Sequence, residues 1–188
     1  MKKYIFTTLF ALILLPHNAT ALTPYFSTGM TGGFQNSGKH ASTAYSTLWT
    51  MTFGIKYGLT DNIAMRNEIE YAKSDYNFTS DVGGINYEYD ASAQIYMGNI
   101  IAEFRPVGFS SSLYAGFSAG TTNYETTLHH PFSAPTESFS TFTYGATAGV
   151  SLNLIAGLYV DLGLRYLTTA DAGDDGNLTT TAGMHIGF

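Results

Sequence analysis

The chain has 188 residues, with 8 Lys and Arg against 14 Asp and Glu, a formal net charge of −6. Charged residues make up only 12%, about half the usual share, whereas aromatic residues reach 15%. A polyanionic chain is a poor match for a phosphate backbone, which excludes nucleic-acid binding, and the lack of Cys excludes a disulfide scaffold.

The N-terminus has the pattern of a secretory signal peptide. Lys2 and Lys3 precede an uncharged, mostly apolar run that ends at Pro16, and Ala19-Thr20-Ala21 forms a small-x-small cleavage site. The run is too short to span a membrane as a helix. We therefore predict a signal peptide over residues 1–21, cleaved between Ala21 and Leu22, and a mature outer-membrane β-barrel domain over residues 22–188.

The next segment in the chain shows a period of two in hydrophobicity. Between residues 48 and 59, one face carries Trp49, Met51, Phe53, Ile55, Tyr57 and Leu59, and the other carries Thr50, Thr52, Gly54, Lys56 and Gly58. The first face is too apolar for water and the second is too small and polar for a packed core. This pattern indicates a strand with lipid on one side and a polar lumen on the other.

Similar segments recur along the chain with alternating short and long connections. We expect strands at about residues 22–34, 44–59, 63–78, 87–105, 113–124, 138–152, 158–169 and 178–188. An even number of antiparallel strands that closes on itself satisfies all backbone groups in lipid. The sequence thus predicts an all-β protein, an eight-stranded antiparallel up-and-down transmembrane β-barrel, monomeric and surrounded by outer-membrane lipids.

The fourth predicted strand and the connection before it depart from the simple pattern. In the fourth, Glu103 and Arg105 share their parity with Ile95, Met97 and Ile101, so both faces are apolar in the middle. The long connection that precedes it is expected to extend above the membrane as a hairpin that turns at Gly83-Gly84.

Eight charged side chains within the predicted strands fall on the polar parity. They are Lys56, Arg66, Glu68, Glu70, Glu103, Arg105, Asp161 and Arg165, and His185 shares their face. Strand direction predicts that Arg66 pairs with Glu103, that Asp161 approaches His185, and that Lys56 lies in the same layer. Because eight strands leave an interior that side chains can fill, we expect a charged network that plugs the lumen rather than a channel.

Other polar groups could carry chemistry. His185 near Asp161 is half of a hydrolase triad, but it is expected on the lumen face near the C-terminus, so we predict no catalytic residues and no enzyme. Adjacent His129 and His130 chelate poorly, so no metal site or cofactor is expected there. The acidic loop of Asp171, Asp174, Asp175 and Asn177 matches no EF-hand spacing, and calcium binding there is left open.

Aromatic side chains gather in or beside the predicted outer loops. Tyr76, Phe78, Tyr87, Tyr89 and Phe132 are the candidate interaction residues, with Tyr124 and Phe139 nearby. Exposed aromatic side chains among acids are typical of a binding surface. The alternative, left open here, is that the Tyr residues belong to an aromatic girdle at the membrane boundary.

Four stretches together resemble a known family. Arg66–Tyr71 reads R-N-E-I-E-Y, Tyr114–Gly120 reads Y-A-G-F-S-A-G, Gly163–Thr169 reads G-L-R-Y-L-T-T, and the chain ends in Gly187-Phe188. This is similar to the opacity-type, OmpA-like family of eight-stranded outer-membrane surface proteins. The resemblance implies surface exposure, adhesion or immune recognition by the loops, and a C-terminal Phe188 read by the barrel-insertion machinery. Glu103 departs from the aspartate-aromatic ending that many relatives carry.

The sequence thus predicts a cell outer-membrane protein whose extracellular loops meet a host molecule or other extracellular ligand. A narrow passive porin is the alternative, and a lipid-modifying outer-membrane enzyme is the second alternative. Nothing in the loops names the ligand or host.

Overall fold

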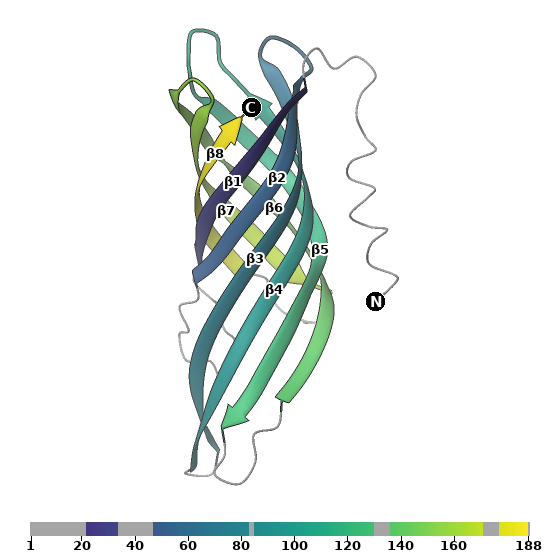
Figure 1. Ribbon diagram of the computed structural model, residues 1–188, viewed down its shortest axis with the longest axis vertical. Helices are drawn as coiled ribbons and strands as arrows, with labels where there is room; N and C mark the ends of the chain where they lie inside the picture. The colour runs from purple at the N-terminus through teal and green to yellow at the C-terminus, as the bar shows by residue number, and fades with distance from the viewer. Residues whose placement is uncertain (1–21, 34–46, 83–84, 130–135, 171–176, 188) are drawn as a thin grey trace.

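The computed structural model describes residues 22–33, 47–82, 85–129, 136–170 and 177–187. Eight strands close into a single barrel (Figure 1): β1 (Leu22–Gly33), β2 (Thr47–Gly58), β3 (Ile63–Val82), β4 (Ile85–Phe104), β5 (Ser112–His129), β6 (Thr136–Ile155), β7 (Leu158–Thr169) and β8 (Asn177–Gly187). No helix able to cross a membrane is found among the described residues.

Each strand pairs antiparallel with its neighbour in sequence, and β8 returns to pair with β1. The predicted fold is therefore confirmed, including the strand with two apolar faces. The ladder between β3 and β4 reaches Val82 opposite Ile85, and the expected turn residues Gly83-Gly84 lie outside the described residues. The assignment of Arg105 to a strand was wrong: it lies just past the end of β4, where its N–H donates to the Asn62 carbonyl in the turn.

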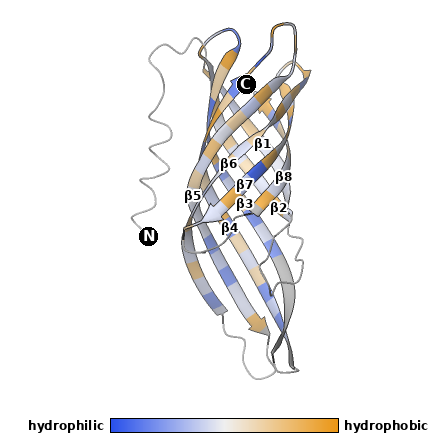
Figure 2. Cartoon of the chain, turned by 180° about the vertical axis from the view of Figure 1, so that it is seen from behind, coloured by the Kyte–Doolittle hydropathy of each residue, from blue (hydrophilic) through white to orange (hydrophobic). Residues whose placement is uncertain are grey.

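The outer surface of the barrel is apolar, as the period-two pattern predicts. Phe53 and Phe117 are 68% and 77% exposed, and the strands alternate between hydrophobic and hydrophilic residues along their length (Figure 2). Two side chains on the outward parity depart from this. Tyr57, expected to face lipid, is buried between β1 and β3 at the end of β2, and Asn67 is buried among the apolar side chains of its neighbours.

Strands β3, β4, β5 and β6 have 18 to 20 residues, whereas β1, β2, β7 and β8 have 11 or 12. About 10 tilted residues cross the bilayer, so the four long strands continue beyond it as a curved half-cylinder at the lower end of Figure 1. The first outward charges on the long strands, Lys73, Asp90 and Glu125, mark where lipid ends. We call this part, residues 73–93 with 123–129 and 136–142, the surface extension.

Inside the barrel, an apolar layer lies between the surface extension and the charged part of the lumen. It consists of Ala72, Ile95, Met97 and Leu167, with Leu48 packed against it. The apolar middle of β4, which blurred the sequence pattern, supplies two of these side chains. The layer therefore places apolar side chains inside the barrel at this height.

A closed barrel of this kind resists detergent until it is heated. We expect the purified protein to migrate faster on an electrophoresis gel before boiling than after it, because the folded ring stays compact in sodium dodecyl sulfate. Identical migration of boiled and unboiled samples would contradict the closed fold.

Candidate functional site

The centre of the lumen is the Arg66 guanidinium from β3. Its Nε lies 3.0 Å from Glu103 Oε1 on β4, and its Nη1 donates to Asp161 Oδ2 on β7 at 2.7 Å. The pair expected from strand direction, Arg66 with Glu103, is therefore present. Register puts the two residues on a diagonal of the β3–β4 ladder, since Arg66 stands opposite Ile101. Arg66 is 2% exposed, so these carboxylates are needed to compensate its buried positive charge.

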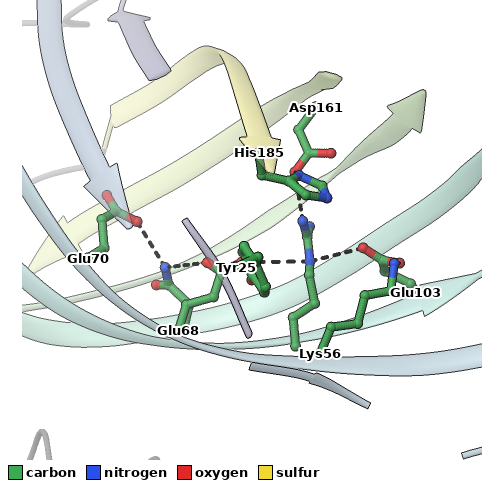
Figure 3. Close-up of polar contacts among 9 residues, drawn as sticks. Tyr25, Lys56, Glu68, Glu70, Glu103, Asp161 and His185 are labelled. Atoms are coloured by element: carbon green, nitrogen blue, oxygen red, sulfur yellow. Dashed lines mark hydrogen bonds and ion pairs between the residues drawn. The ribbon is translucent and has the colours of Figure 1, made fainter. Parts of the chain in front are cut away.

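Lys56 and His185 complete this layer toward the end of the barrel where the short turns lie; Figure 3 shows both side chains with their partners Glu103 and Asp161. Lys56 Nζ contacts the second Glu103 oxygen and lies 5.2 Å above the Tyr159 ring. His185 Nδ1 lies 3.3 Å from Asp161 Oδ2, as predicted, and its ring stacks on Tyr159 with centroids 4.6 Å apart. The imidazole is thus fixed between a carboxylate and an aromatic face.

A second set of polar contacts lies between this charged layer and the apolar layer of Ala72, Ile95, Met97 and Leu167. Glu68 accepts a hydrogen bond from the Tyr25 hydroxyl, and Asn99 Nδ2 donates to Glu68 at 3.0 Å and to Glu70 at 2.9 Å. Arg165 Nη1 donates to Glu70 Oε1 at 2.5 Å. Sequence reasoning placed the charged members of this set on the lumen face but missed Tyr25 and Asn99. The alternation along the strands could have placed both side chains in the lumen. It could not single them out, because many uncharged polar residues share that face.

Two glycines make room for an aromatic side chain inside the barrel. A Cβ at Gly149 or Gly163 would overlap the Tyr114 hydroxyl. With that space, the Tyr114 ring lies 5.1 Å below the Arg66 guanidinium carbon, a cation–π contact. The ring therefore covers the face of the guanidinium that the carboxylates leave uncovered.

Two cavities lie along the lumen, on either side of the Arg66 layer. The outer one, about 90 Å³, is lined by β1, β2 and β3 side chains together with Tyr114, Asp161 and Arg165. The other, about 270 Å³, lies at the end of the barrel that holds the turn between β2 and β3, and its lining includes Lys56, Arg105, Tyr159 and His185. No residue lines both cavities. The two cavities are separated by Arg66, Tyr25, Glu103 and their partners.

The surface extension presents different chemistry on its two faces. Tyr124 and Phe139 stand opposite each other on the lumen parity, with stacked rings 4.9 Å apart, and Tyr89 shares that parity on β4. The outward face carries Asp75, Glu88, Asp90 and Glu125, all exposed. Lys73 is the sole base among the described side chains of this part. Its Nζ lies 2.9 Å from Asp75 Oδ2, and that carboxylate raises the pKa of the ammonium.

Several candidate residues lie where their side chains are not described. Tyr76 and Phe78 belong to β3 and Tyr87 and Tyr89 to β4, but only the side chains of Tyr87 and Tyr89, both half-buried, fall within the described part. Phe132, His130, Phe188 and residues 171–176 lie outside the described residues, as does the predicted signal peptide. In the described part of the chain, no three His, Asp or Glu side chains group as metal ligands.

A family model for the outer membrane protein beta-barrel domain matches residues 6–188. The chain belongs to this family. Membership confirms the resemblance to OmpA-like barrels and the location in the outer membrane. No curated protein matches the chain significantly in sequence.

Solved structures of this family share its fold. Neisserial surface protein A has a TM-score of 0.56 at 13% identity, over 90% of this chain and 99% of that one. Ail, the attachment invasion locus protein of Yersinia pestis, was solved with the heparin analogue sucrose octasulfate and has a TM-score of 0.55 at 16% identity, over 89% and 97%. A major outer membrane protein of Thermus thermophilus reaches 0.59 at 12%, over 88% and 99%. At such identities the likeness shows the fold.

Proposed function

We propose that this protein is a non-conducting outer-membrane anchor that presents the β3–β6 surface extension for recognition at the cell surface. The observation that carries the proposal is the unequal length of the strands, which lifts four of them beyond the bilayer while the other four end near it. Long, paired strands hold their side chains in one geometry, which an interaction surface requires. Two neighbours in the family, an attachment protein and a surface protein, are consistent with such a role.

The lumen supports the anchor part of this proposal. The two cavities have no lining residue in common, and the ion pairs of Arg66 and Arg165 cross the space between opposite walls. An apolar layer follows on the extracellular side. These features support an interior without a continuous water path, so we favour the anchor over a passive porin.

We expect no steady conductance when the purified protein is reconstituted in planar bilayers, because ions would have to break buried pairs to pass. Arg66→Ala is expected to produce brief openings, since it removes the cation that joins three walls of the lumen. A large and steady conductance of the unaltered protein would contradict the plugged lumen.

Removal of the hairpin tip tests the recognition part. Tyr76 pairs with Ala91, so deletion of Asn77–Asp90 and closure with an Asn-Gly turn keeps this cross-strand pair and the barrel below it. We expect the shortened protein to fold, to be heat-modifiable, and to lose most of the adherence that the full protein gives to bacteria expressing it.

The matched control exchanges Asn77–Asp90 for a Ser- and Gly-rich segment of equal length, which keeps bulk but removes the ordered strands. The control should lose adherence as the deletion does. Full adherence of either variant would show that the surface extension is not the recognition surface.

Charge narrows the class of partner. The described side chains of the surface extension include five acids and one base: Asp75, Glu88, Asp90, Glu125, Glu137 and Lys73. A polysulfated ligand such as the one seen with Ail would meet repulsion here and is not the partner that we propose. An enzymatic role is not proposed, because His185 is 2% exposed and its ring packs on aromatic side chains inside the lumen.

Delivery follows from features at the two ends of the chain. We propose that residues 1–21 direct export and are removed after Ala21, and that the terminal Phe188 is read by the barrel-insertion machinery. Phe188→Ala is the test: it should slow assembly into the outer membrane in cells while leaving refolding in detergent unchanged.

A further inference from the structure

The surface extension ends at one side in an open strand edge. Within the described residues, β6 pairs with β7 only from Thr143 opposite Thr169 downward, and Phe142 accepts one more hydrogen bond from the Ala170 N–H. From Thr136 to Phe142 the ladder continues on the β5 side alone. Such an edge presents unpaired N–H and C=O groups that another strand can join.

The groups that face this edge can be identified. In a strand, the N–H and C=O of one residue point to the same side, and the side alternates along the chain. Because the Phe142 carbonyl points to β7, the main chains of Ser140, Ser138 and Thr136 point to the open edge as well. Charge, Pro and bulges are the usual devices that block strand addition, and here the only charge between Thr136 and Phe142 is Glu137.

The edge segment reads T-E-S-F-S-T and is complementary to itself. If two copies pair antiparallel with Phe139 opposite Phe139, then Ser138 stands opposite Ser140 and Glu137 opposite Thr141. The edge-facing residues then meet as hydrogen-bonded pairs, and the Phe139 residues meet as a non-hydrogen-bonded pair, where side chains come closest. This register keeps the one acid away from its own copy. Phe139 is 59% exposed and offers its free ring surface to such a pair.

Symmetry then decides where the second copy lies. The twofold axis between two antiparallel edge strands is perpendicular to their sheet. In a barrel wall this direction is radial, so it lies in the plane of the membrane. A half-turn about it inverts the second barrel. Two copies in one membrane cannot be related in this way, whereas copies in two facing membranes can.

We propose that the open edge of β6, from Thr136 to Phe142, pairs with the same edge of a second copy held in a facing membrane. The proposal rests on the surface extension being the recognition surface, and it names the partner as this chain itself. Four strands from each copy would form one continuous sheet of eight strands, the same number of strands as in each barrel. The protein remains monomeric within its own membrane and joins two membranes across the gap.

The pairing sets the distance between the membranes. At a rise of about 3.3 Å per residue and a tilt of about 40°, Phe139 stands about 13 Å above Tyr144, the outward aromatic residue at the membrane boundary on β6. The boundaries of two paired copies are therefore about 25 Å apart. Electron cryomicroscopy of contact zones between protein-bearing vesicles measures this spacing directly, and a gap above about twice that value would overturn the β6 register.

A charge exchange tests the register. Ser138 and Ser140 are exposed, lie on the outward parity, and face each other in the proposed pair. Phosphatidylcholine vesicles that carry the unaltered protein should aggregate. Vesicles with Ser138→Lys and Ser140→Lys should aggregate at least 10-fold more slowly, as should those with Ser138→Glu and Ser140→Glu, because like charges then oppose each other. A mixture of the two variants should recover the original rate.

The matched control places the same charges at Ser92 and Gln94, on the outward parity of the central strand β4, where they should leave each rate unchanged. Dispersed vesicles with the unaltered protein, rapid aggregation of either charged variant alone, or no recovery in the mixture would each overturn the proposal. Aggregation with protein-free vesicles would assign the edge to lipid instead. Loss of host adherence on hairpin deletion together with dispersed vesicles would reject this partner while keeping the proposed function.

Discussion

Glu103→Ala is expected to lower the free energy of unfolding by about 3–5 kcal/mol where burial is complete, because it leaves Arg66 and Lys56 without their shared carboxylate. Glu103 is 3% exposed and contacts both cations. Water in the adjoining cavities reduces this cost. Urea titration of the protein refolded in lipid vesicles gives the free energy, and the loss of heat-modifiable migration reports the same transition.

The double variant Arg66→Ala/Glu103→Ala should recover part of the loss. The recovery stays partial because Arg66 also pairs with Asp161, so its removal leaves this half-buried carboxylate with His185 alone. We expect a coupling of about 0.5–3 kcal/mol between the two sites. Lys73→Ala, at an exposed ion pair, serves as the control and should change stability by less than about 0.5 kcal/mol. Strictly additive losses would show that Arg66 and Glu103 do not interact.

Gly163→Ala is the second substitution with a large expected effect. The added Cβ would overlap the Tyr114 hydroxyl and lie 2.7 Å from the Ala148 carbonyl oxygen, so the Tyr114 ring must move away from Arg66. Overpacking of this kind costs about 1–3 kcal/mol. The urea midpoint should fall, with the slope of the transition unchanged.

Tyr114→Phe in the same chain removes the overlapping hydroxyl and should restore part of the stability that Gly163→Ala loses. Gly32→Ala is the matched control, because a Cβ there would have Thr180 Oγ1 at 3.8 Å as its nearest contact. If Gly163→Ala and Gly32→Ala proved equally harmless, the proposed packing of Tyr114 under Arg66 would be wrong.

The strands and the charged face of the lumen could be predicted because lipid imposes them. An outward charge within the bilayer costs about 2–4 kcal/mol, so parity alone assigned Arg66, Glu103 and Asp161 to the interior, and strand direction then paired Arg66 with Glu103. Arg105 was misplaced because the pattern does not show where pairing stops and a turn begins.

Contacts across the lumen could not be predicted in the same way. Arg66 meets Asp161 and Arg165 meets Glu70 from strands that are not neighbours in the ring. Which heights face each other there depends on the stagger of all eight strands, a property of the closed ring. The length of the surface extension was underestimated for another reason: above the bilayer both faces of a strand meet water, so the alternation that marks a strand in lipid disappears.

The ion pairs across the lumen bear on how the barrel assembles. Seven of the eight strand pairs join neighbours in sequence, but β1 and β8 join Tyr25 to Gly187, and the cross-lumen pairs each span 95 residues. Local hairpins form early, whereas distant contacts must first meet the entropy of closing a long loop. Arg66 and Arg165 therefore keep their hydration shells until the last strand docks. The interior therefore loses its water in the same late step that closes the ring. Substitutions that keep the hairpins but remove these ion pairs should increase the unfolding rate more than they decrease the folding rate.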